Sequence, residues 1–70
     1  MEIGLRFPSG KFVLFDKINY DPVTTSLDAY LLRLQTWPTL YGGKQYRAVK
    51  AYWMSTQDGE TSFVIRMEEI

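Results

Sequence analysis

Residues 49–66 have the sequence VKAYWMSTQDGETSFVIR, in which two apolar runs flank a polar segment. Both runs are rich in aromatic and β-branched residues, and the polar segment contains Asp58-Gly59. Such a segment between two strand-like runs predicts a β-hairpin, because glycine tolerates the left-handed backbone that tight turns require. We therefore expect two antiparallel strands here.

The type of turn decides which side chains of this hairpin share a face. A two-residue turn at Asp58-Gly59 would pair Lys50 with Met67 and bury a lysine. A type I turn over residues 56–59, with Gly59 left-handed in a bulge, places the apolar pairs on one face and is the turn we expect. Its pairs are Trp53–Phe63, Ala51–Ile65, Val49–Met67 and Arg47–Glu69.

A second hairpin is expected near the N-terminus, around Phe7-Pro8-Ser9-Gly10-Lys11. Proline is favoured as the second residue of a type I turn. In a two-residue turn, Pro8 would lack the backbone N–H that the ladder needs. The expected pairs are Leu5–Val13, Ile3–Phe15, Gly4–Leu14 and Arg6–Phe12.

A helix of about a dozen residues is expected between the hairpins. Thr25-Ser26-Leu27-Asp28 resembles a capping box at its start. Pro38 ends the helix, because its ring disfavours helical geometry at Trp37. The apolar residues that recur at helical spacing are Val23, Leu27, Tyr30, Leu31 and Leu34.

The segment after the helix, residues 37–41, is expected as an apolar loop that packs over one end of the core. Gly42-Gly43 then gives the chain the freedom to begin the second hairpin. The pattern GxxxxGK[ST] of phosphate-binding loops is not matched here, because Pro38 and Gln45 occupy two of its positions.

The order ββαββ predicts a single α+β domain over residues 1–70. We expect a four-stranded antiparallel sheet with one helix packed on one face. The predicted sheet residues of the core are Ile3, Leu5, Val13, Phe15, Val49, Ala51, Trp53, Phe63, Ile65 and Met67.

One helix covers one face of a sheet, so the other face is expected to be open. Its residues mix aromatic, aliphatic and basic side chains: Arg6, Phe12, Leu14, Tyr46, Lys50, Tyr52, Val64, Arg66 and Glu68. The candidate binding residues among them are Arg6, Phe12, Tyr46, Lys50, Tyr52 and Arg66. This mixture is typical of protein interfaces and of surfaces that stack single-stranded nucleic acid, and strand propensity alone also favours Tyr and Phe.

Composition excludes several kinds of chemistry. The chain has no Cys and no His, so it forms no disulfide and has no thiolate, imidazole or typical zinc site. Its serines lack a histidine partner and its carboxylates are dispersed, so we expect no enzyme activity, no metal and no cofactor. Eight basic residues balance eight acidic ones, so no overall field attracts nucleic acid or anionic lipid.

The 70-residue length makes the core marginal, and no disulfide or metal strengthens it. Self-association is another common source of stability, so we expect a homodimer. The expected function is a non-enzymatic protein-interaction module that uses the open face or an edge strand, with regulation of a larger partner as one such role. The alternative is a module that binds single-stranded nucleic acid on the open face.

The cellular location is expected from the N-terminal sequence. Met1-Glu2-Ile3-Gly4 has no cationic segment before an apolar run, which argues against a secretory signal. No apolar stretch approaches the roughly 20 residues of a membrane helix. We expect a cytoplasmic protein with no membrane partner.

Overall fold

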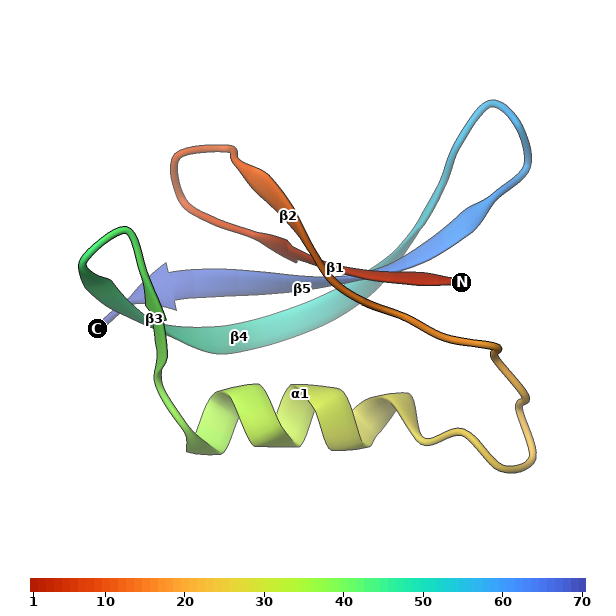
Figure 1. Ribbon diagram of the computed structural model, residues 1–70, viewed down its shortest axis with the longest axis horizontal. Helices are drawn as coiled ribbons and strands as arrows, with labels where there is room; N and C mark the ends of the chain where they lie inside the picture. Colours follow the sequence, from red (N-terminus) through yellow and green to blue (C-terminus); the bar gives the residue numbers. More distant parts are fainter.

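The computed structural model describes all 70 residues and contains one helix and one five-stranded sheet (Figure 1). The elements are β1 (Glu2–Arg6), β2 (Phe12–Lys17), α1 (Leu27–Thr36), β3 (Thr39–Tyr41), β4 (Lys44–Ser55) and β5 (Thr61–Glu69). The sheet has the order β2-β1-β5-β4-β3, and the helix lies along one side of the curled sheet. The predicted α+β class is confirmed.

The predicted four-stranded sheet is wrong because residues 39–41 form the additional strand β3 instead of a loop. Gly42 and Gly43 have φ angles of 59° and 78°, and they join β3 to β4. Left-handed backbone at both central residues is typical of a type I′ hairpin turn. These glycines therefore form a second kind of tight turn, where the sequence suggested only chain freedom.

The sheet is mixed, so the prediction of a fully antiparallel sheet is wrong for two of its inner strands. β1 and β5 are parallel neighbours, with Ile3 beside Phe63 and Leu5 beside Ile65. Each hairpin is internally antiparallel, as predicted. The pattern within a hairpin carries no information about which of its strands will meet another hairpin, so the parallel pairing was not predicted.

Both predicted hairpin turns are confirmed. The Gly10 N–H donates to the Phe7 carbonyl at 2.9 Å, and the Gly59 N–H donates to the Thr56 carbonyl at 3.1 Å. Gly10 and Gly59 have φ angles of 90° and 82°. The predicted pairs that the structure confirms are Leu5–Val13, Gly4–Leu14, Arg6–Phe12, Trp53–Phe63 and Ala51–Ile65.

Two bulges, at Phe15 and Val49, interrupt the hairpin ladders. On β2, Leu14 lies opposite Gly4 and Asp16 lies opposite Ile3, so Phe15 is the extra residue. On β4, Val49 is the extra residue, because the register shifts between Ala48 and Lys50. The predicted pairs Ile3–Phe15, Val49–Met67 and Arg47–Glu69 are therefore wrong.

The buried core lies between the sheet and the helix. Phe7, which the sequence placed only in a turn, stacks on Tyr41 with ring centroids 4.4 Å apart and meets the edge of Tyr46 at 4.8 Å. The core residues are Ile3, Leu5, Phe7, Leu34, Ala48, Phe63, Ile65 and Met67.

Several residues predicted in the core are substantially exposed. The bulges leave Phe15 36% and Val49 42% exposed. Trp53 has the predicted pairing with Phe63 and a ring contact with it at 5.3 Å, but is 50% exposed. The face of Trp53 was thus predicted correctly and its burial was not.

The helix ends as predicted, but its start differs. Trp37 follows the last helical residue, and its N–H donates to the Arg33 carbonyl. The expected capping box does not form: Ser26 is the N-cap residue without a side-chain cap hydrogen bond, and the Thr25 hydroxyl accepts from the Asp21 N–H. Val23 lies outside the helix and is exposed, while the rest of the predicted apolar stripe packs on the core.

The Phe12 ring lies so close to Gly4 that a Cβ added to Gly4 would overlap it. Gly4→Ala should therefore lower the free energy of unfolding by about 1–3 kcal/mol, the usual cost of overpacking. In a Phe12→Ala background the same change should cost much less, because the obstructing ring is gone. Urea unfolding of the four proteins at equal concentration measures this coupling, and an equal cost in both backgrounds would contradict it.

Candidate functional site

The face of the sheet opposite α1 carries the predicted site residues except Tyr46. Phe12 on β2 pairs with Arg6 on β1, Arg6 pairs with Arg66 on β5, and Arg66 pairs with Lys50 on β4. These residues form one row across the strands. Tyr52 lies in the neighbouring row, opposite Val64.

Tyr46 does not belong to this face, which corrects the predicted site. The bulge at Val49 reverses the alternation on the N-terminal part of β4, so that Ala48 and Tyr46 face the helix side. The Tyr46 ring packs against Phe7 at the edge of the core. Arg47 occupies the open face instead, opposite Glu68.

Basic side chains dominate the polar part of the open face. The Arg6 guanidinium lies 5.3 Å from the Phe12 ring centroid and donates to the Gly10 carbonyl at 3.1 Å. Arg66 has a long ion pair of 3.8 Å with Glu68, and both side chains are about half exposed. Lys50 has no carboxylate within ion-pair distance. The row Arg6–Arg66–Lys50 is therefore only weakly neutralised.

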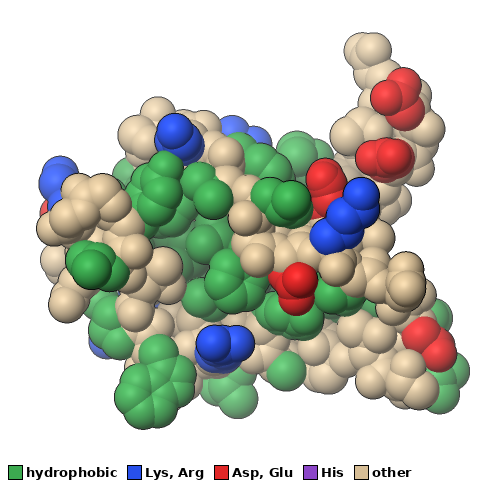
Figure 2. All heavy atoms as spheres, viewed as in Figure 1, with side chains coloured by type: hydrophobic (Ala, Val, Ile, Leu, Met, Phe, Trp, Pro, Cys, Tyr) green, Lys and Arg blue, Asp and Glu red, His purple; other side chains and the backbone are tan.

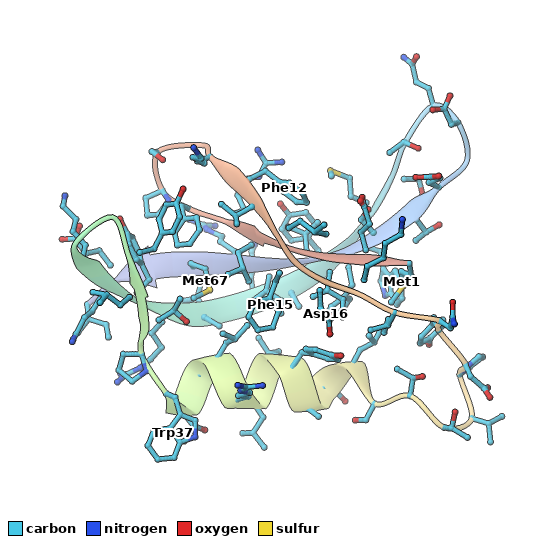
Figure 3. All side chains as sticks on the ribbon, viewed as in Figure 1. Met1, Phe12, Phe15, Asp16, Trp37 and Met67 are labelled. Atoms are coloured by element: carbon cyan, nitrogen blue, oxygen red, sulfur yellow. The ribbon has the colours of Figure 1, made fainter.

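The apolar part of this face is less open than the sequence suggested. Val64 is fully buried and lies between Gly4 and Tyr52 in the sheet. The Phe12 ring lies over Gly4, on the side of β2 away from α1 (Figure 3). Phe12, Leu14 and Tyr52 remain exposed in part. Phe12 is thus both a packing residue and a surface residue.

The outer edge of β4 is a further candidate site that the sequence did not single out. β3 pairs with β4 only from Lys44 to Tyr46. Residues 47–55 have β5 on one side, and no hydrogen bond outside that ladder involves them. Val49, Tyr52 and Trp53 are exposed apolar side chains along this edge. Unpaired backbone beside apolar side chains favours pairing with another strand.

The largest hollow, of about 520 Å³, lies beside Trp53. The rings of Tyr20 and Trp53 meet edge to face at 5.9 Å and form part of its wall. No sequence signal pointed to Tyr20, because it lies outside the strands and helix and approaches Trp53 only through the tertiary fold. The lining residues are Met1, Glu2, Lys17, Tyr20, Trp53, Glu60 and Thr61.

A second hollow, of about 420 Å³, lies between β2 and α1 and includes Arg33. The bulge directs Phe15 and Asp16 toward the helix (Figure 3). The Tyr30 hydroxyl donates to Asp16 Oδ2 at 2.9 Å. This hydrogen bond, followed by burial and the charge of Asp16, raises the pKa of Tyr30, while Arg33 opposes the shift. The Tyr30 hydroxyl therefore stays protonated and donates its hydrogen bond to the Asp16 carboxylate.

Charge is distributed unevenly over the molecule. Figure 2 shows acidic side chains on the projecting β4–β5 hairpin, whose turn contains Asp58 and Glu60. Hydrophobic side chains gather across the middle of the same view.

The helix α1 is too short and too polar to cross a membrane.

The Tyr30–Asp16 hydrogen bond should make stability depend on pH in the alkaline range. The raised pKa of Tyr30 favours its protonated form in the folded state. Its contribution is therefore complete below the unfolded pKa of about 10 and is lost as the pH rises through the folded value. Urea unfolding between neutral and alkaline pH should show a steeper loss for the parent protein than for Tyr30→Phe. Equal slopes would contradict a contribution from this hydrogen bond.

The geometry thus offers a basic and aromatic sheet face, a free edge of β4, and two open hollows beside aromatic side chains. None of the protein-family models, curated proteins or solved structures compared with this chain matches it.

Proposed function

We propose that the protein is a non-enzymatic protein-interaction module that self-associates through the outer edge of β4. The observation that carries this proposal is the outer edge of residues 47–55, whose outward backbone groups have no strand partner and are flanked by Tyr52 on one face and Trp53 on the other. Strand addition gains main-chain hydrogen bonds and buries alternate side chains. The outer edge of β4 offers both the free backbone groups and the exposed apolar side chains that strand addition uses.

The small core supports the same proposal. The core consists of the residues around Ile3, Phe7 and Met67, while Val49, Tyr52 and Trp53 remain partly in solvent. A domain of this size gains stability when a second copy covers such side chains. An edge contact would bury them on both faces of the sheet at once.

Symmetric stacking of two open faces is less favourable than pairing of edges. Arg6, Arg66 and Lys50 cross the open face, with Glu68 as the only carboxylate in an ion pair with the row. A face-to-face dimer would bring two such rows together, and like charges held close together repel. The edge of β4 presents Lys50 alone from this row.

A charge introduced at Trp53 should dissociate the dimer. We expect the parent protein to have roughly twice the chain mass of 8.2 kDa at high concentration, in low and high salt, because backbone and apolar contacts resist screening. Trp53→Lys should shift the mass toward the monomer. Trp37→Lys is the matched control, since Trp37 is 69% exposed and follows the C-terminal end of α1, whereas Trp53 lies beside the first residues of the helix. Light scattering across concentration measures this.

Circular dichroism checks that both tryptophan variants remain folded. A parent protein that is monomeric at every concentration would refute self-association. Equal dissociation by Trp53→Lys and Trp37→Lys would refute the assignment to β4.

A second candidate function is binding of single-stranded nucleic acid on the open face. The row Arg6–Arg66–Lys50 favours it, because such cations neutralise phosphates while Phe12 and Tyr52 offer rings for stacking bases. Net charge is zero over the whole chain, so this binding would depend on the local row.

Charge reversal tests this second function. Lys50→Glu with Arg66→Glu should abolish binding of a mixed-sequence oligonucleotide at low salt. Each single replacement, Lys50→Glu or Arg66→Glu, should weaken binding without abolishing it. It should reduce the slope of log K against log salt by about 0.7 for each phosphate that the variant no longer neutralises. Lys44→Glu with Arg33→Glu gives the same change in net charge outside the row. Fluorescence anisotropy measures the binding, and equal losses in both double variants would refute the site.

A further inference from the structure

The backbone groups along β4 alternate in direction, and the hairpin turn fixes their phase. The Thr56 N–H donates to the Glu60 carbonyl at 2.8 Å, so these residues form a hydrogen-bonded pair. In an antiparallel ladder, such pairs alternate with pairs whose N–H and C=O groups point outward. Counted along the observed register, the outward groups belong to Ser55, Trp53 and Ala51.

Two-fold symmetry limits how a second β4 can pair with this edge. An axis perpendicular to the sheet keeps both helices on one side. Residues directly opposite each other then point to the same side of the sheet, so the axis must lie between one residue and its own copy. An axis at Lys50 would oppose two lysines. An axis at Ala51 would extend the pairing across the bulge at Val49. The regular part of the edge leaves axes at Tyr52 or Trp53.

Side-chain volume distinguishes these two arrangements. An axis at Trp53 sets Trp53 against its own copy and pairs two small residues, Ala51 and Ser55, which leaves that position poorly filled. An axis at Tyr52 sets Tyr52 against its own copy on the open face and sets Trp53 of each copy beside Ala51 of the other. Large residues beside small ones fill space better than equal sizes do. This arrangement also places Lys50 opposite Met54, so the two lysines are not directly opposed.

We propose that two copies pair β4 to β4 in antiparallel orientation, with Tyr52 on the two-fold axis and Trp53 packed on Ala51 of the second copy. The inference rests on the self-association proposed above and specifies its register. The outward groups of Ala51 and Trp53 would hydrogen-bond to those of Trp53 and Ala51 across the axis. The paired segment, residues 50–54, ends before the bulge at Val49 and before β3, which occupies the edge at Tyr46.

The absence of native cysteine permits a direct test with single cysteines. On the axis, Tyr52→Cys would lie in a non-hydrogen-bonded pair with Cα atoms about 4.5 Å apart, within the range of a disulfide. Under mild oxidation it should form a covalent dimer at least about tenfold faster than Leu32→Cys, because pairing raises the effective thiol concentration. Leu32 is a control on the exposed side of α1, 63% exposed.

A second cross-linking experiment leaves Tyr52 in place. A mixture of the Ala51→Cys and Trp53→Cys proteins should give the mixed disulfide, whereas each alone should react no faster than the Leu32→Cys control. Faster reaction of Trp53→Cys alone would overturn the register. If the parent protein is a dimer by light scattering but no cysteine on β4 exceeds the control, the edge pairing is overturned and self-association stands. A monomeric parent protein overturns both.

Discussion

The parallel pairing of β1 with β5 is the contact on which the rest of the structure depends. It joins two hairpins that are otherwise separate in sequence, and it places Ile3 and Leu5 beside Phe63 and Ile65 in the buried centre. The same register brings Arg6 beside Arg66. The core on one face and the basic row on the other therefore have a common origin.

The bulges decide which side chains reach each surface. One extra residue on β4, Val49, turns Tyr46 toward Phe7 and gives its expected place on the open face to Arg47. One extra residue on β2, Phe15, directs Asp16 toward Tyr30. Two local irregularities thus redistribute an aromatic ring and a carboxylate between the faces, with the hairpins intact.

The sequence predicted what local chemistry determines. Pro8, Gly10 and Gly59 specify turns, and the structure has both turns and the register next to each. Pro38 lies where the helix has ended. All of the predicted site residues except Tyr46 share a face because they lie close enough to a turn, or on the correct side of a bulge, for alternation to hold.

What the sequence did not predict depends on contacts between distant segments. Neither bulge has a glycine or proline to mark it, since the extra residues are Phe15 and Val49. The pairing of β1 with β5 and the short length of β3 also follow from how the hairpins pack. Consequently the free edge of β4 had no counterpart in the sequence pattern, although Tyr52 and Trp53 on it were already identified.

The bulge at Phe15 also affects the opposite edge of the sheet. β2 is the outermost strand there. Its ladder with β1 is short and is interrupted by the bulge, after which come the charged residues Asp16 and Lys17. Bulges and charges at an edge discourage the addition of further strands. The proposed two-fold contact through β4 would be closed by its own symmetry, whereas repeated addition at β2 would extend without limit. The bulge and the charged end of β2 therefore disfavour further strand pairing on that side of the sheet.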